Sequence, residues 1–332
     1  MADFFNQTTH HTLQVITNAR CHLGIVHRPT VILGLSGGPD SVFLFRVLAR
    51  LHVDGHLCLV AAHLDHEWRS TSGADAQFCA DLCHAASVTL VNAKASALAV
   101  SVKANGSKEE VGRRLRRHFY ELVRQQYNAD FIVLAHHRQD QQETFFMRLV
   151  RGTTLNGLTC MKAIEGRYLR PLLEVDKTSI IDYLTMNHLP FRIDPTNEAD
   201  AYLRNRIRKY VVPALKSIDP RFEQKLASTT KHLQEEDAYL QELTQEMLSR
   251  VFGSNNGGSV GNLPEFKKLH PVMQRRVLVR WLIMHRVPFS PSAAYLDEVL
   301  RFINHDAGGR HCFDTWSIVK KGQHLWLEQC SS

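Results

Sequence analysis

A glycine-rich segment that reads LSGGPDS from residue 35 carries the residue types needed to bind phosphate. Two adjacent glycines let the backbone turn sharply and direct its N–H groups at an anion. A helix that starts after this turn adds the positive end of its dipole, and Asp40 can hold Mg²⁺ against phosphate groups. No lysine follows the glycines, so the loop is not of the Walker type. The predicted phosphate-binding residues are Ser36, Gly37, Gly38, Pro39, Asp40 and Ser41.

The segment HLDHEWR at 63–69 is a second candidate, because it follows an apolar run and gathers polar side chains. His63, Asp65 and Arg69 could bind a metal ion or phosphate, or they could belong to a solvated loop. Zinc is not expected here, since zinc sites use ligand sets with a more defined spacing.

The segment AHHRQDQQET at 135–144 follows another apolar run and opens a helix. Asp140 and Glu143 are three residues apart, so they share one side of this helix. Paired carboxylates at the end of a strand could ligate Mg²⁺ or position an attacking amine.

Two arginine-rich stretches add positive charge. In EEVGRRLRR, the helical spacing of Glu109, Arg113 and Arg116 puts an acid and two guanidinium groups on one face. This face could be a salt-bridged surface, or it could clamp phosphate and a polar base edge, which suit the planar arginine fork. The stretch YLRNRIR at 202–208 follows the turn signal DPTN. Its arginines could brace a domain junction or bind an RNA backbone, and we favour binding.

Short apolar runs alternate with helical stretches over the first half of the chain. This alternation predicts an α/β fold, a Rossmann-like parallel sheet with helices on both faces. Right-handed crossovers put the carboxyl ends of the strands at one edge, where open α/β sheets bind ligands. The candidate residues fall at these ends. The expected strands are 30–35, 57–64, 88–91 and 131–135, and the expected helices are 41–51, 74–86, 109–126 and 141–151.

After about residue 213 the alternation stops, which predicts a mainly helical α+β C-terminal domain. A long amphipathic helix is expected from Asp219 to Gly253, because a capping aspartate precedes a proline there and a glycine ends the apolar pattern. Further helices are expected at 271–285 and 291–304, and a hairpin of strands 312–319 and 323–327 around 320–322. We therefore expect one domain at 1–215 and a second domain at 216–332.

Composition fits a globular protein that binds a polyanion. The chain of 332 residues is 44% hydrophobic and 22% charged, with a formal net charge of +7. A positive surplus favours a nucleic-acid partner. No apolar run reaches the roughly 20 residues of a membrane span, so no membrane partner is expected. The N-terminus shows no export signal, and the seven cysteines contain no C-x-x-C pair, so a reducing, cytoplasmic location is expected.

The motifs together resemble those of the tRNA(Ile)-lysidine synthase family, within the N-type ATP-pyrophosphatase (PP-loop) superfamily. The resemblance covers residues 31–215 and depends on the order of SGGPDS, HLDHEWR, the E-x-x-x-R-x-x-R helix, AHHRQDQQET, LVRGTTLNGL, RPLL and DPTN…RNRIR. SGGPDS alone would indicate only the superfamily, and the later motifs are more specific.

The resemblance implies a ligase. The C2 oxygen of the wobble cytidine in a CAU anticodon attacks the α-phosphate of ATP, and the ε-amine of free L-lysine then displaces AMP. The product, lysidine, changes codon specificity from AUG to AUA. ATP, Mg²⁺, L-lysine and tRNA(Ile) are thus the implied ligands. A homodimer is compatible with the sequence, which does not give the oligomeric state.

The same resemblance implies roles for the candidate residues. Residues 36–41 would bind the leaving pyrophosphate, with Asp40 near Mg²⁺. The implied catalytic residues, which would act on the cytidine, the metal and lysine, are Asp40, Arg113, Arg116, Asp140 and Glu143. His63, Asp65, Arg69 and His136 complete the ATP-binding set. Glu109 would orient the arginines, and the RNA would be supported by Arg204, Asn205 and Arg208. The domain at 1–215 would be the catalytic domain, and the domain at 216–332 would bind tRNA.

This sequence departs from the family pattern at two positions. Gln139 stands where the family usually has the first of two aspartates, and Thr154 stands where a glycine is common.

Three other functions are the alternatives to this one. A tRNA thiolase would need a persulfide or Fe–S cysteine motif. An amidotransferase-type synthetase would carry a glutaminase domain, and a non-enzymatic RNA-binding protein would not need the phosphate loop.

Overall fold

The computed structural model describes residues 2–68, 72–98, 108–193, 202–253, 260–287, 292–313 and 315–330. The chain divides into two compact units, Met1–Thr230 and Lys231–Ser332, which are described one at a time. Within the described ranges, no helix combines the length and the apolar character that crossing a membrane requires.

The first unit is built on a six-stranded sheet with the order β3-β2-β1-β4-β6-β5. Its first five strands in this order run parallel, and only β5 is antiparallel to its neighbour. The α/β class and the four predicted strands are confirmed, whereas the short β5–β6 hairpin was not predicted. The strands are β1 (Thr30–Gly34), β2 (Cys58–Asp65), β3 (Thr89–Lys94), β4 (Phe131–Val133), β5 (Ile164–Glu165) and β6 (Tyr168–Leu169).

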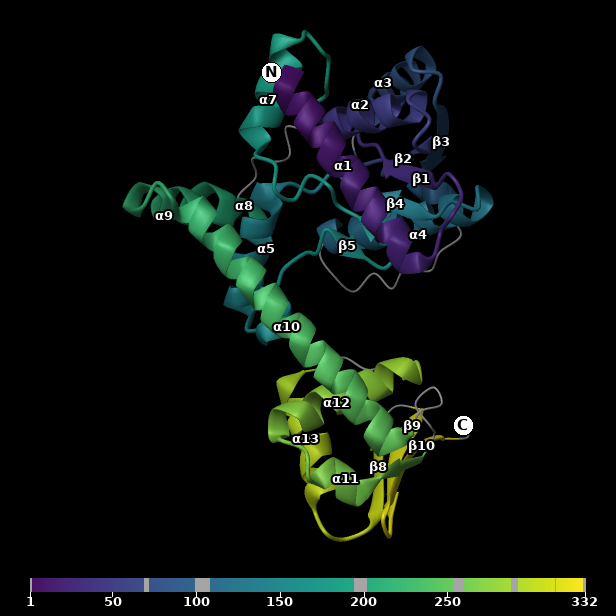
Figure 1. Cartoon of the computed structure of the whole chain (residues 1–332), viewed down its shortest axis with the longest axis vertical. Helices are drawn as coiled ribbons and strands as arrows, with labels where there is room; N and C mark the ends of the chain where they lie inside the picture. Colours follow the sequence, from purple (N-terminus) through teal and green to yellow (C-terminus); the bar gives the residue numbers. More distant parts are fainter. Residues whose placement is uncertain are drawn as a thin grey trace. The chain divides into compact units, whose positions relative to one another are not determined.

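Helices connect and cover these strands (Figure 1). The four predicted helices are present, and the sequence analysis missed α1 and α7. The helices are α1 (Ala2–Leu23), α2 (Pro39–Val53), α3 (Ser72–Ala85), α4 (Lys108–Gln126), α5 (Arg138–Arg151), α6 (Leu155–Leu158), α7 (Lys177–Met186), α8 (Leu203–Arg206) and α9 (Val212–Ile218), with a 3₁₀ turn at Ala95–Ala97 and a π-helical turn at Ile207–Val211.

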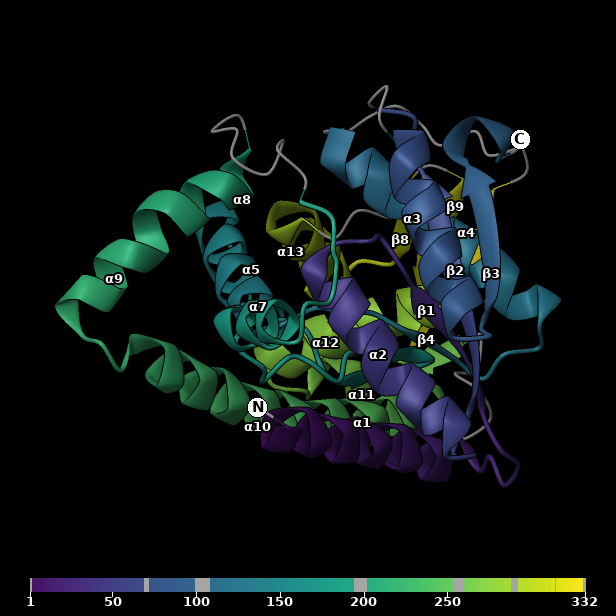
Figure 2. The same cartoon turned by 90° about the horizontal axis from the view of Figure 1, so that it is seen from above.

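Apolar residues alternate between the two faces of the sheet, as the two-residue period of a strand requires. Val31 and Leu33 of β1 belong to the core that α1, α2, α3 and α7 complete. Ile32, between them, faces the core that α4 completes through Phe119 and Val123. Helices α1 and α2 lie side by side on the first face (Figure 2). The sheet is therefore covered on both faces, and its carboxyl edge stays available for a site.

Gly34, the last residue of β1, leaves room for Tyr120 of α4. A Cβ atom at Gly34 would lie 2.7 Å from the Cζ and Oη atoms of Tyr120. Both elements are fixed in the core, so we expect Gly34→Ala to lower the free energy of unfolding by about 1–3 kcal/mol through overpacking. Urea denaturation measures this loss. Gly73→Ala is the matched control, because a Cβ there meets nothing within 4 Å, and equal stability of the two variants would contradict this packing.

The second unit is a helical α+β domain, as predicted. Its antiparallel sheet has the order β7-β10-β9-β8, and Trp281 is fully buried in its core. Its elements are the C-terminal part of α10 (Phe222–Phe252), β7 (Val260–Asn262), α11 (Leu263–Lys267), α12 (Pro271–Met284), α13 (Ala293–Asn304), β8 (Gly309–Phe313), β9 (Trp316–Lys321) and β10 (His324–Gln329).

One predicted strand of this unit is wrong. Residues 312–319 are not a single strand, because β8 ends at Phe313 and β9 returns antiparallel from Trp316, its cross-strand partner. Lys320, predicted in the hairpin turn, lies in β9 and is only 2% exposed. Its Nζ donates to the carbonyl oxygen of Phe302 at 2.7 Å, at the C-terminal end of α13. A cation there compensates the unsatisfied carbonyls of a helix end, which explains why this lysine is buried.

Candidate active site

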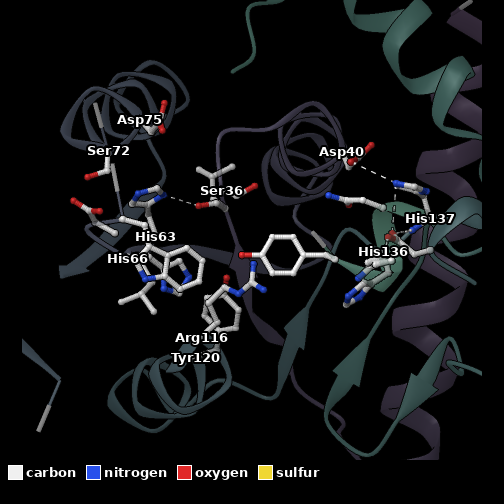
Figure 3. A pocket seen from close by; sticks show the side chains of 18 of the residues that line it. Ser36, Asp40, His63, His66, Ser72, Asp75, Arg116, Tyr120, His136 and His137 are labelled. Carbon is white, nitrogen blue, oxygen red and sulfur yellow. Dashed lines mark hydrogen bonds and ion pairs between the residues drawn. The ribbon is translucent and has the colours of Figure 1, made fainter. Parts of the chain in front are cut away.

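A cavity of about 550 Å³ lies in the first unit at the carboxyl edge of the sheet, within the usual range for small-ligand sites. It is lined by the ends of β1 and β2, by α4, and by residues that follow β4 (Figure 3). Ten predicted site residues line it: Ser36, Asp40, His63, Asp65, Arg116, His136, Asp140, Arg204, Asn205 and Arg208. Segments separated by more than 150 residues therefore meet in one site.

The other predicted site residues that the structure describes are not among those that line the cavity. Gly37, Gly38, Pro39 and Ser41 belong to the loop beside the cavity and the start of α2, Arg113 lies on α4, and Glu143 is buried on α5. Arg69 and the side chain of Glu109 lie outside the described residues, so their roles stay predictions.

The phosphate loop is held in shape by its own serines. Gly37 has a φ of +83°, a conformation that glycine adopts without steric cost. The Oγ of Ser41 donates to the carbonyl oxygen of Gly38 at 2.9 Å and accepts from the N–H of Ser36 at 3.2 Å. Helix α2 begins at Pro39, two residues before the predicted start, because proline suits the first helical position. The loop is therefore preorganised at a helix N-terminus.

Asp40 faces the cavity with one carboxylate oxygen engaged and one unengaged. Its Oδ2 lies 3.5 Å from the Nε2 of His137 and 3.5 Å from the Nζ of Lys177. Its Oδ1 is buried and has no hydrogen-bond partner within the described ranges. An unengaged carboxylate oxygen next to a phosphate loop suits Mg²⁺, which usually combines one or two carboxylates with substrate phosphates. The described residues contain no cluster of three metal-ligating side chains, so such an ion would also need oxygens from its substrate.

The two predicted carboxylates of α5 are paired with arginines. Glu143, 1% exposed, accepts from the Nε atoms of Arg204 and Arg208, each at 2.5 Å. Asp140 accepts from Arg204 and, at 2.9 Å, from the N–H of His137. Burial opposes ionisation of Asp140, but the charges of His137 and Arg204 hold the pKa of this carboxyl below its usual range. The arginines thus brace α8 and the π-helical turn against α5, and they line the cavity at the same time.

Helix α4 contributes concentrated positive charge. Arg116 lines the cavity. Burial, followed by the charges of Arg204, Arg170, Arg116 and Arg117, lowers the pKa of Arg113. Arg114 of the same helix pairs with Glu110 at 2.5 Å. A cluster of close guanidinium groups favours an anionic ligand, and the clamp role of Arg113 and Arg116 stays a prediction.

Sequence reasoning gave no individual role to several lining residues. His66 and Trp68 stack with ring centroids 4.5 Å apart, and Gly112 of α4 leaves room for the indole, whose Cη2 would lie 2.4 Å from a Cβ there. A glycine inside an arginine-rich helix was the available signal for this contact. The other polar or aromatic residues of this kind are Glu67, Ser72, Asp75, Tyr120, His137, Lys177 and Tyr202.

Two adjacent histidines in this site have opposite pKa shifts. Burial, assisted by nearby arginines, lowers the pKa of His136 to about 4. His137 is also buried, but its hydrogen bond to Asp40 and the charges of Asp140 and Asp40 raise its pKa above the usual value. At neutral pH, His136 is therefore neutral.

These shifts predict opposite pH effects on stability. The contribution of neutral His136 is present above pH about 6.5 and is lost as pH falls toward 4, whereas that of His137 is present at low pH and is lost as pH rises through its folded pKa. NMR titration of the ring C2–H signals, assigned with His136→Asn, is expected to show both shifts. Asp40→Asn is expected to lower the pKa of His137. Titration of both rings near pH 6.5 would contradict this arrangement.

Comparison with known proteins agrees with this geometry. Residues 6–215 match the family described as PP-loop domain, and residues 262–326 match the TilS substrate binding domain. The chain is 34% identical to the tRNA(Ile)-lysidine synthase of Bacillus cereus over 85% of its own length and 61% of that protein. It is also 34% identical to the enzyme of the same name from Bacillus subtilis, over 82% of this chain and 59% of that one. The chain thus spans about three-fifths of the length of these relatives.

A solved structure shares the fold of the chain. The U34-tRNA thiolase NcsA from Methanococcus maripaludis superposes with a TM-score of 0.57 and 16% identity, over 71% of this chain and 81% of that one. The Bacillus relatives bear the name of the family that the sequence motifs resemble, so the resemblance is confirmed. The chain belongs to the PP-loop family, with a C-terminal match to the TilS substrate binding domain.

Proposed function

We propose that this chain carries out the reaction named for its Bacillus relatives, the synthesis of lysidine on tRNA(Ile). One observation supports this most strongly: the phosphate loop with Asp40 meets the acid–arginine cluster in a single cavity. This cluster consists of Asp140, Glu143, Arg204 and Arg208. Such a cavity can bind a nucleotide, a polar base and an amine together. Bringing three reactants into one site removes much of the entropic barrier to their reaction.

In the first step, the C2 oxygen of the wobble cytidine attacks the α-phosphorus of ATP, and pyrophosphate leaves with its bonding electrons. The N–H groups of the loop and the positive end of α2 stabilise the negative charge that develops on pyrophosphate. Asp40 would hold Mg²⁺, which neutralises phosphate charge when it is bound. Arg116, which lines the cavity, would contact the base or the α-phosphate.

In the second step, the ε-amine of L-lysine attacks C2, and AMP leaves with the former C2 oxygen. The ammonium group must lose a proton before it attacks. Asp140 and Glu143 are its proposed partners, and both are engaged by Arg204 and Arg208 in the structure. Binding of lysine at these carboxylates therefore requires the arginines to change partners, which would free their guanidinium groups for RNA phosphates.

The remaining assignments are proposals of the same kind. Arg204, Asn205 and Arg208 would support the tRNA, and the region from residue 216 would help to select it. A homodimer is compatible with these roles. All seven cysteines are described and are free thiols, which supports the reducing cytoplasm as the proposed compartment.

The test is incorporation of labelled lysine into a tRNA(Ile) transcript with a CAU anticodon, in the presence of ATP and Mg²⁺. We expect incorporation that depends on ATP, and its loss when the wobble cytidine is changed to uridine. No incorporation into the CAU transcript, or undiminished incorporation into the uridine variant, would refute the proposal.

A further inference from the structure

Lys177 brings a cation to the phosphate loop from another part of the chain. It is the first residue of α7, it lines the cavity, and its Nζ lies 3.5 Å from the Oδ2 of Asp40. The loop itself contains no lysine. The Lys177 side chain is 34% exposed, so a ligand in the cavity can reach it.

Gln139 connects the start of α5 to the start of α7. Its Nε2 donates to the Oδ2 of Asp176 at 3.0 Å, and its Oε1 accepts from the N–H of Lys177 at 3.1 Å. Asp176 in turn caps α7 by accepting from the N–H of Thr178 at 2.8 Å. The two contacts of Gln139 require a side chain that donates one hydrogen bond and accepts another. An amide can do this, whereas an ionised carboxylate can only accept. We call this arrangement of Gln139, Asp176 and Lys177 the amide clamp.

We propose that Lys177 binds the β- and γ-phosphates of the nucleotide at the loop, and that the amide clamp positions it there. The inference rests on the proposed use of ATP. An ammonium group is a compact, mobile charge that binds phosphate well. Asp40, its partner in the structure, is also the residue that would hold Mg²⁺, so arrival of a Mg²⁺–phosphate group brings several anionic oxygens next to Lys177. Gln139 acts through Lys177 and is a positioning residue.

A different role for Lys177 would be to neutralise Asp40 alone. The two roles differ in their dependence on Asp40. A lysine that binds the terminal phosphates still contributes to pyrophosphate affinity in Asp40→Asn, where no carboxylate charge remains to be neutralised. A lysine that only neutralises Asp40 contributes nothing in that background, so adding Lys177→Met then costs no further affinity. Neither role weakens the binding of AMP, which lacks the terminal phosphates.

Calorimetric titration with Mg²⁺–ATP, Mg²⁺–pyrophosphate and AMP tests the first half of the proposal. A hydrogen bond to a charged group contributes about 1.5–3 kcal/mol, so we expect Lys177→Met to weaken ATP and pyrophosphate binding by about 10- to 100-fold. AMP binding is expected to stay within about twofold of wild type, and Lys177→Arg to retain part of the lost affinity. Lys225→Met is the matched control, because Lys225 also pairs with an aspartate, Asp219, at 2.6 Å and does not line the cavity.

Gln139→Leu tests the second half of the proposal, the positioning of Lys177 by the amide clamp. Leucine removes the contacts of the Gln139 amide with Asp176 and with the N–H of Lys177. We expect a smaller loss of pyrophosphate affinity than in Lys177→Met, and no additional loss when the two changes are combined. Additive losses would contradict positioning through Lys177. Circular dichroism checks folding, and if the methionine variant is unfolded, the comparison of Lys177→Gln with Lys177→Arg replaces it.

The remaining outcomes separate this inference from the proposed function. Wild-type affinity of Lys177→Met for pyrophosphate, or an equal loss for AMP, would overturn the role of Lys177 and leave ATP binding intact. Failure of the wild-type chain itself to bind Mg²⁺–ATP and pyrophosphate would overturn the proposed function and, with it, this inference.

Discussion

Replacing Asp40 with asparagine is expected to reduce tRNA-dependent AMP release by about 10²- to 10³-fold, because a group that stabilises developing charge is lost. The change keeps the size of the side chain and removes only its charge. Asp40 borders the phosphate loop, and its buried Oδ1 has no hydrogen-bond partner in the described part of the chain. Loss of this charge should raise the Mg²⁺ concentration needed for half-maximal activity. Binding of tRNA, measured by filter retention, is expected to change by less than about twofold, since phosphate-backbone contacts dominate RNA affinity.

The matched control for this change lies at the other end of the same helix. Asp54 is the C-cap residue of α2 and pairs with Arg50 at 2.8 Å on the surface. An exposed pair of this kind contributes little, about 0–1 kcal/mol, so Asp54→Asn should keep wild-type AMP release. If Asp40→Asn lost tRNA binding and ATP cleavage together, the assignment of Asp40 to the phosphates would be wrong.

Replacing Glu143 with glutamine is expected to lower both stability and activity. Glu143 is 1% exposed and accepts from two arginines. Removing its charge takes this anion away from Arg208 and leaves Arg204 with Asp140, and both arginines are partly exposed and can recover hydration. The expected loss in the free energy of unfolding is therefore about 1–3 kcal/mol, below the roughly 3–5 kcal/mol typical of a broken pair that is fully buried. Urea denaturation measures the loss.

Glu121→Gln provides the comparison for Glu143→Gln. Glu121 pairs with Arg124 at 2.7 Å, and its side chain is one-third exposed, so its loss should cost less than about 1 kcal/mol. The proposed lysine contact adds a second expectation, a higher KM for lysine in Glu143→Gln than in wild type. A variant with wild-type stability and wild-type KM would show that the acid–arginine cluster neither braces α5 nor binds the amine.

The sequence predicted the parts of the site that local chemistry specifies. The glycines and serines of residues 36–41 indicate their structure directly, because adjacent glycines after a buried strand allow the backbone to turn sharply into a helix. The ends of the strands could also be predicted, because the short apolar runs indicate which residues form the strands of the sheet. These two signals predicted that Asp40 and His63 lie at the same edge of the sheet, and both residues line the cavity.

Contacts between distant segments were beyond the sequence. The pairing of Glu143 with Arg204 and Arg208 spans more than 60 residues, and both partners appeared as separate candidates with separate roles. The departure at Gln139 was visible, but its contacts with Asp176 and Lys177 depend on how α7 packs. Helix α1 was missed because its apolar residues are interleaved with polar threonines, two of which, Thr8 and Thr12, are buried.

The wrong prediction of one strand at 312–319 has a similar cause. Residues 312–319 contain β-forming side chains on both sides of the turn that separates β8 from β9, so the pattern did not show where one strand ends. Lys320 was predicted in the hairpin turn, whereas it is buried in β9. Its burial depends on the carbonyl groups at the end of α13, and no local pattern reports that contact.

The most direct test of the proposed reaction follows the phosphates of ATP with lysine omitted. ATP labelled at the α-phosphate is incubated with the protein, Mg²⁺ and the CAU transcript, and the RNA is then separated from the nucleotides. We predict that the α-label becomes attached to RNA while pyrophosphate is released, and that added lysine moves this label into AMP. Release of ADP and inorganic phosphate, or formation of AMP at the same rate without RNA, would contradict the proposal that the cavity activates an RNA base.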